Sequence, residues 1–153
     1  MTKTRELMIL IAEDDAGHAR LMEKNLTRAG LNNRMQRFTN GQEVLDFLFR
    51  RGEGPKRVMD KSYLLLLDIR MPQVDGIEVL RQVKADAELR KIPVIMLTTT
   101  DDPREVERCH TIGCSSYIVK PVDYDKFAEA IKHLGLYISL VEVPEISGES
   151  PSQ

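Results

Sequence analysis

Hydrophobic and polar residues form short blocks along the chain, and the blocks are of two kinds. Short continuous apolar runs are typical of strands that are buried on both faces of a sheet. Five segments show this pattern clearly or in a weaker form: Leu7–Ala12, Arg34–Phe38, Tyr63–Leu67, Pro93–Leu97 and Ser116–Val119. After each of them, apolar residues recur at the spacing of an amphipathic helix. This alternation predicts an α/β fold, a doubly wound five-stranded parallel sheet with five helices.

The length of 153 residues fits a single domain. We expect residues 1–143 to form this domain, with an extended last helix that carries Phe127 and Ile138 on its core-facing side. From Pro144 to Gln153 the chain is rich in Glu, Ser, Gly and Pro, which predicts a disordered polar tail over residues 144–153. A longer polar connection, Arg51–Ser62, precedes the third strand.

Composition excludes several classes of protein. The net charge is −2, from 22 basic and 24 acidic residues, so no nucleic-acid or membrane surface is indicated. No apolar run approaches the roughly 20 residues of a membrane span, and Met1–Glu6 lacks the apolar region of a signal peptide. Cys109 and Cys114 do not form a CxxC motif. We therefore expect reduced thiols in a cytoplasmic protein.

The most informative single residue is Asp68, which directly follows the apolar run Tyr63–Leu67. Its position places a carboxylate at the carboxyl end of a buried strand. Open α/β sheets bind ligands and carry out chemistry at that edge. A carboxylate is costly beside such a buried strand unless it has a function.

Other polar residues follow the remaining strands and should meet Asp68 at the same edge. Glu13 and Asp14 follow the first strand, Thr98 the fourth and Lys120 the fifth. Carboxylates gathered in one crevice repel each other unless a cation lies between them, and hard oxygen ligands suit Mg²⁺. A lysine and a hydroxyl beside them complete a site for a phosphoryl group, with Asp68 as the nucleophile.

These motifs occur in a fixed order, each at the end of a strand. They are Glu13-Asp14, Asp68 with Met71-Pro72 and Asp75-Gly76, Leu97-Thr98-Thr99, and Tyr117-Ile118-Val119-Lys120-Pro121. In this order the chain resembles a receiver domain of a two-component response regulator, from about Leu7 to about Ser139. The resemblance implies a flavodoxin-like receiver fold and Mg²⁺-dependent phosphoryl transfer from a sensor histidine kinase to Asp68.

The resemblance also assigns roles to individual residues. It implies a metal site for Mg²⁺, or Mn²⁺, made by Asp14 and Asp68 directly, by Glu13 through water and by the backbone carbonyl of Arg70. Thr98 and Tyr117 match the family's switch pair. The long connection Arg51–Ser62 and the extended end resemble stand-alone regulators that serve bacterial phytochromes and related sensor kinases, which indicates a phytochrome as a candidate partner.

Alternative interpretations remain for the same residues. Glu13, Asp14 and Asp15 are also suited to capping the first helix. An aspartate-nucleophile phosphatase of the haloacid dehalogenase type would need an acid two residues after Asp68, where this chain has Arg70. A nucleotide-binding fold would need a glycine-rich loop after the first strand. A receiver that binds partners without phosphorylation is a further alternative.

Two expectations concern surfaces rather than the crevice. The last helix carries a second apolar stripe besides its core-facing one, made by Ala130, Leu136, Tyr137 and Leu140. One-sided docking on a sheet needs a single apolar face, so we expect a homodimer through this helix, or else an extension that folds back on its own domain. The three histidines have no sequence neighbours that suggest catalysis, and we expect them on helix surfaces: His18, His110 and His133.

Overall fold

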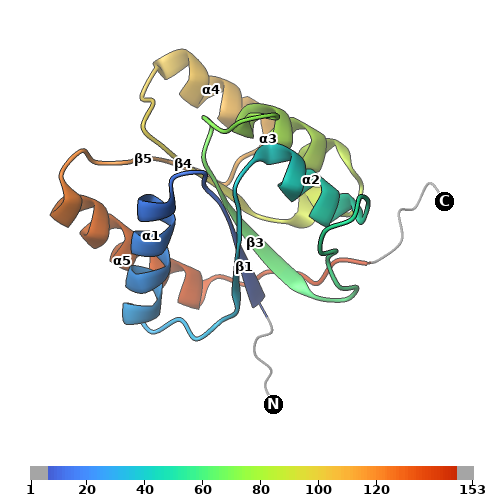
Figure 1. Ribbon diagram of the computed structural model, residues 1–153, viewed down its shortest axis with the longest axis horizontal. Coiled ribbons are helices and arrows are strands. Elements are labelled where there is room, and N and C mark those ends of the chain that lie inside the picture. Colours follow the sequence, from blue (N-terminus) through green and yellow to red (C-terminus); the bar gives the residue numbers. More distant parts are fainter. Residues whose placement is uncertain (1–6, 148–153) are drawn as a thin grey trace.

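A computed structural model describes residues 7–147 of the chain and shows one parallel sheet (Figure 1). Its strands are β1 (Leu7–Ala12), β2 (Met35–Phe38), β3 (Ser62–Leu67), β4 (Val94–Thr98) and β5 (Ser116–Val119). They are hydrogen-bonded in the order β2-β1-β3-β4-β5, and every pair is parallel. The predicted fold class is confirmed, with β3 at the centre of the sheet.

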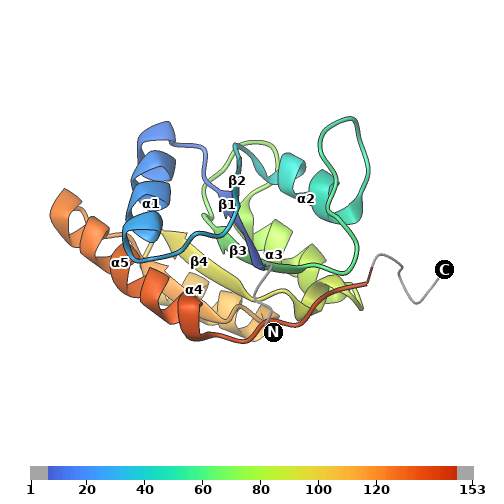
Figure 2. The same cartoon turned by 90° about the horizontal axis from the view of Figure 1, so that it is seen from below.

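Helices follow the strands as expected. They are α1 (Ala16–Arg28), α2 (Gly41–Phe49), α3 (Gly76–Ala85), α4 (Pro103–Ile112) and α5 (Tyr124–Leu140), with a short 3₁₀ helix at Leu89–Lys91. An Asp or Asn side chain accepts a backbone N–H bond at the start of each α-helix, which satisfies otherwise unpaired donors there. Figures 1 and 2 show α1 and α5 on one face of the sheet and α2, α3 and α4 on the other.

The two faces have separate apolar cores. The one under α1 and α5 contains Leu26, Phe127 and Ile131, whereas the other contains Val44, Leu80 and Cys109. β3 contributes to both cores because its alternate leucines point to opposite faces. A strand covered on both sides reads as a continuous apolar run, which explains the sequence Leu64–Leu67.

The register of the strands brings their carboxyl ends together. Ala12 pairs with Leu67, so Glu13 and Asp68 leave adjacent strands at the same level. The Asp68 amide donates to the Ala12 carbonyl at 3.1 Å, and the Lys120 amide donates to the Thr98 carbonyl at 2.7 Å. These backbone bonds fix Asp68, Thr98 and Lys120 along one edge of the sheet.

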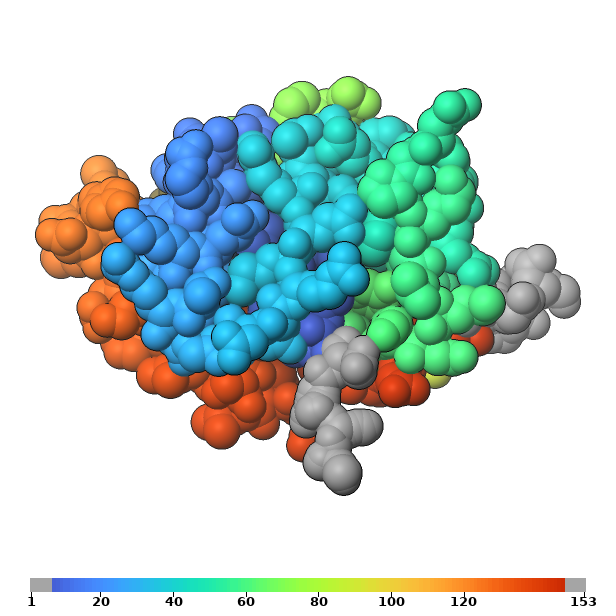
Figure 3. Space-filling model, turned by 60° about the horizontal axis from the view of Figure 1, so that its bottom comes forward, coloured from blue at the N-terminus to red at the C-terminus, as the bar shows by residue number. Residues whose placement is uncertain are grey.

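The prediction of a disordered tail from Pro144 is wrong for residues 144–147. Ile146 is 1% exposed and forms an isolated antiparallel bridge with Lys61. The Ser147 amide donates to the Glu88 carboxylate at 2.6 Å. Figure 3 shows this edge of the molecule, where the connection 51–61 in green meets the C-terminal segment in red. Burial of the Ile146 side chain in the core is enough to order this segment, although the residues around it are polar. Residues 148–153 lie outside the described part of the chain.

Within residues 7–147, no helix has the length and apolar character that crossing a membrane requires. The longest helix, α5, has 17 residues and ends at Leu140. Residues 141–147 then cross the amino-terminal edge of the sheet, where the Ser62 hydroxyl donates to the Val143 carbonyl at 3.0 Å. This segment therefore joins the α5 side of the domain to the α2–α3 side.

Candidate functional site

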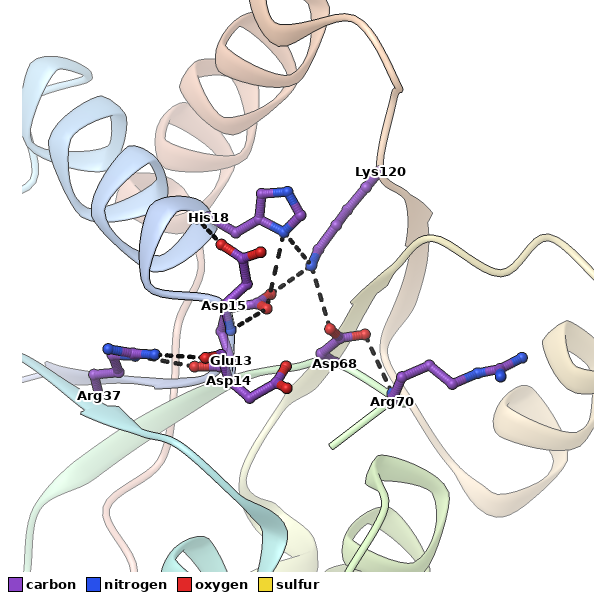
Figure 4. A network of polar contacts seen from close by, with 8 residues as sticks. All are labelled: Glu13, Asp14, Asp15, His18, Arg37, Asp68, Arg70 and Lys120. Carbon is purple, nitrogen blue, oxygen red and sulfur yellow. Dashed lines mark hydrogen bonds and ion pairs between the residues drawn. The ribbon is translucent and has the colours of Figure 1, made fainter. Parts of the chain in front are cut away.

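Three carboxylates meet where β1 and β3 end (Figure 4). Glu13, Asp14 and Asp68 each offer an oxygen, and these atoms lie within 4.8 Å of one another. Glu13 is 1% and Asp68 7% exposed, whereas Asp14 is open to solvent. Oxygen ligands at this spacing, with one side open to water, fit the needs of Mg²⁺, which usually binds one or two carboxylates and keeps several waters. The structure thus brings together the three acids that the sequence analysis selected.

Lys120 provides a cation inside this cluster. It is 5% exposed and reaches from the loop after β5 towards the acids (Figure 4). Its ammonium donates to the Glu13 carboxylate and, at 3.3 Å, to Asp68 Oδ2. Burial raises the pKa of Glu13 above its ordinary value, and the Lys120 ammonium offsets part of that rise. One lysine cannot neutralise three carboxylates, so the site favours a further cation.

Thr98 ends β4 with its side chain fully buried. Among the described residues, nothing forms a hydrogen bond with its Oγ1 atom. A buried hydroxyl without a partner costs free energy unless a ligand or water supplies one. Thr98 therefore carries a free donor at the same edge of the sheet as Asp68.

Tyr117 is half-buried on β5, and its hydroxyl donates to the Thr100 carbonyl at 2.8 Å. Burial raises the pKa of Tyr117 to about 12, so the hydroxyl stays protonated and remains a donor. Thr100 lies two residues after Thr98 in the β4–α4 loop. Tyr117 is thereby tied to the loop that follows Thr98, and its switch role stays a prediction.

Arg70 lies close to Asp68 through its backbone rather than its side chain. Its amide donates to Asp68 Oδ1 at 3.4 Å, and its guanidinium points away from Asp68 in Figure 4. No second carboxylate occupies this position, as the phosphatase alternative would require. The role of the Arg70 carbonyl as a metal ligand stays a prediction.

Two residues at the site escaped the sequence analysis. His18, which we expected on a helix surface, lies in the first turn of α1 with Nδ1 3.2 Å from Lys120 Nζ. Arg37 on β2 donates from Nε to the Glu13 carbonyl at 2.9 Å and from a terminal nitrogen to the Asp14 carbonyl at 3.0 Å. Only their positions in the sequence could have indicated that they lie near the site. His18 follows Asp14 by about one helical turn, and Arg37 is next to the carboxyl end of the edge strand β2.

Comparisons with known proteins agree with this geometry. The family model of the response regulator receiver domain matches residues 9–132 of this chain. A response regulator receiver domain from Rhodospirillum rubrum is 46% identical, with a TM-score of 0.86, over 92% of this chain and 99% of that one. The Mn²⁺-bound form of response regulator Rcp1 is 26% identical, with a TM-score of 0.81, over 90% of this chain and 98% of that one.

Regulators connected with phytochromes are also among the similar structures. The bacteriophytochrome response regulator RtBRR is 35% identical, with a TM-score of 0.69, over 90% of this chain and 82% of that one. The family match spans most of the chain and contains Asp14, Asp68, Thr98 and Lys120. The chain therefore belongs to the response regulator receiver domain family.

Proposed function

We propose that this chain is a response regulator that accepts a phosphoryl group on Asp68 from a phosphohistidine of a sensor histidine kinase. The observation that carries the proposal is the position of Asp68 between a buried lysine and two further carboxylates. Lys120 Nζ lies 3.3 Å from Asp68 Oδ2, and oxygens of Glu13 and Asp14 lie within 4.8 Å. Such a set can hold a phosphoryl group as soon as its charge is balanced.

In the proposed step, a carboxylate oxygen of Asp68 attacks the phosphorus of the phosphohistidine. A P–O bond forms, the P–N bond breaks, and its electron pair stays on the kinase histidine. Lys120 donates to the phosphoryl oxygens, and the unpartnered Thr98 hydroxyl is available as a second donor. Glu13, Asp14 and Asp68 would hold Mg²⁺ or Mn²⁺, with the Arg70 carbonyl as a further ligand. That cation would supply positive charge next to the phosphoryl oxygens.

Replacement of the acceptor tests this function. Wild-type protein with Mg²⁺ and radiolabelled acetyl phosphate should become labelled, whereas Asp68→Asn should fold normally and stay unlabelled. The matched control is Asp101→Asn, which removes an exposed acid that follows β4 but lies outside the cluster. Labelling of Asp68→Asn at the wild-type rate would refute the assignment.

A switch is the proposed consequence of phosphorylation. A ligand shifts a conformational equilibrium only through its different affinity for the two states. Here the difference would come from the Thr98 hydroxyl, which gains a phosphoryl partner, and from Tyr117, which is bonded to the loop after Thr98. Crystallisation with beryllofluoride, a phosphoryl mimic, tests this coupling. Thr98 should donate to the fluoride and Tyr117 should turn further inward, and an unchanged β4–α4 loop would count against the switch.

The partner surface is proposed to include a second copy of the chain at α5. Leu136 is 53%, Tyr137 51% and Leu140 82% exposed, which is unusual for large apolar side chains on one helix. Ala130 and Tyr137 also line a hollow of about 370 Å³ beside β5. Symmetric pairing would cover this surface. Sedimentation should show a dimer that Tyr137→Glu dissociates and Tyr124→Glu, at the other end of α5, does not. A wild-type monomer at tens of micromolar would end this proposal.

We propose that the kinase is a phytochrome-type sensor, because this chain shares its fold and 35% of its sequence with the bacteriophytochrome response regulator RtBRR. Both proteins of the pair would then act in the cytoplasm. Phosphotransfer profiling tests this directly. Each purified kinase of the source organism is autophosphorylated and then mixed with the regulator for a short, fixed time. The phytochrome kinase should transfer fastest, and faster transfer from an unrelated kinase would contradict the assignment.

A further inference from the structure

His18 is held rigidly beside the active-site lysine, although it belongs to neither the acid cluster nor the switch pair. Its backbone amide donates to the Asp15 side chain at 2.9 Å, as part of the cap of α1. Its ring lies edge-on to the ring of Phe127 on α5, with centroids 5.5 Å apart and planes at 79°. The side chain is thus held through its backbone and through one ring contact, and Figure 4 shows the ring beside Lys120.

The Lys120 ammonium has three hydrogens and three polar neighbours, each from a different element. The first acceptor is Glu13 after β1, and the second is Asp68 Oδ2 after β3, at 3.3 Å. The third neighbour is His18 Nδ1 on α1, at 3.2 Å, and this atom also lies 3.9 Å from Glu13 Oε2. For Nδ1 to accept, the ring must be neutral with its proton on Nε2, and the side chain is 40% exposed, so water can reach that proton.

We propose that His18 is a positioning residue for phosphoryl transfer, which holds the Lys120 ammonium in place while its other two partners change. The inference rests on the proposed function. When Asp68 becomes an acyl phosphate, Lys120 must exchange its contact with Asp68 Oδ2 for one with the phosphoryl oxygens, and Glu13 is shared with the metal site. His18 is the acceptor that takes part in neither change. A lysine side chain loses considerable rotamer freedom when it is held in one position, so a fixed third acceptor favours the reactive arrangement.

The alternative is that His18 only packs α1 against α5. Two substitutions separate these roles. His18→Phe keeps an aromatic ring against Phe127 but removes the acceptor. His18→Asn removes the ring but can place its side-chain oxygen where Nδ1 was. A packing role predicts that Phe is tolerated and Asn is not, and the positioning role predicts the reverse order.

The experiment measures phosphorylation by acetyl phosphate at saturating Mg²⁺ and, separately, the dissociation constant for Mn²⁺ by calorimetry, in the full chain. Loss of one hydrogen bond to a charged group should slow phosphorylation of His18→Phe by about tenfold. His18→Asn should stay within about threefold of wild type, and both variants should keep the Mn²⁺ dissociation constant within about twofold, because His18 is outside the carboxylate set. Urea unfolding of each variant serves as the control for folding.

Each result decides the question. A His18→Asn variant that is as slow as His18→Phe, or slower, overturns the inference. A rate loss that follows a matching loss of Mn²⁺ affinity also overturns it, since the effect would then lie in the metal site. Wild type that takes up no label at all would instead refute the proposed function, while a labelled wild type with an unaffected His18→Phe variant refutes the role of His18 alone.

Discussion

Asp14→Asn should have opposite effects on stability with and without a divalent cation. Asp14 is exposed, and its carboxylate lies close to those of Glu13 and Asp68. Because like charges repel, the wild-type side chain destabilises the folded state when the metal is absent. Asparagine has the same shape and leaves the backbone bond from Arg37 to residue 14 intact. The substitution therefore isolates the charge.

The separation of the carboxylates sets the size of the effect. Two unit charges 4.8 Å apart repel by about 0.9 kcal/mol at the dielectric constant of water and by about 3.5 kcal/mol at an effective constant near 20. The lower figure applies to Asp14 because it is exposed, and the Lys120 cation offsets part of the repulsion from two neighbours. We therefore expect metal-free Asp14→Asn to be about 1 kcal/mol more stable than wild type.

With metal the order should reverse. A cation that binds only the folded state stabilises it by about 2.7 kcal/mol at a concentration one hundred times its dissociation constant. Asp14→Asn should lose most of this gain. Urea denaturation with EDTA and with Mg²⁺ measures both effects, and Asp101→Asn makes the same change of charge outside the cluster. A variant that is less stable than wild type without metal, or that gains as much from Mg²⁺, would refute the acidic-site reasoning.

Three further predictions concern packing. In urea titrations, Ile146→Ala should lower the free energy of unfolding by about 2 kcal/mol. This is the low end for a buried isoleucine, because its segment can detach from the domain. The control Val122→Ala, at a fully exposed position, should change the free energy of unfolding by less than about 0.5 kcal/mol. Gly135→Ala should cost about 1–3 kcal/mol in the same assay, because the new Cβ would lie 2.6 Å from the Cβ of Ala29, the residue that follows α1. Burial raises the pKa of Cys109 to about 11 and shields its thiol, so a thiol reagent at pH 8 should modify this residue only after unfolding in urea. Rapid modification of the folded protein would contradict its burial.

The fold was predictable because the three inner strands, β1, β3 and β4, are largely buried and therefore appear in the sequence as apolar runs. The run of leucines in β3 predicts a central strand that is covered on both faces. The alternation of strands with helices then restricts the sheet to a few possible topologies. Thr98 shows the usual uncertainty at element boundaries, since it is the last residue of β4 and not the first residue after it. This shift by one residue does not change its place at the edge of the sheet.

What the sequence could not show depends on single long-range contacts. His18 and Lys120 are separated by 102 positions, and no local pattern records that the first turn of α1 lies beside the loop after β5. Ile146 lies in a polar segment whose average composition predicts disorder, yet its one side chain occupies a core position. Composition and periodicity describe averages over a segment, so an isolated residue with a distant partner escapes them.

The central claim is that Asp68 alone carries the phosphoryl group, and chemical trapping tests it most directly. Wild-type protein is phosphorylated, and its acyl phosphate is reduced with tritiated borohydride, which converts the modified aspartate into labelled homoserine. Peptide mapping then locates the label. The account predicts a single labelled position, residue 68, that disappears when Mg²⁺ is withheld. Label on Asp14, on Glu13 or on any residue away from the carboxyl end of β3 would contradict it.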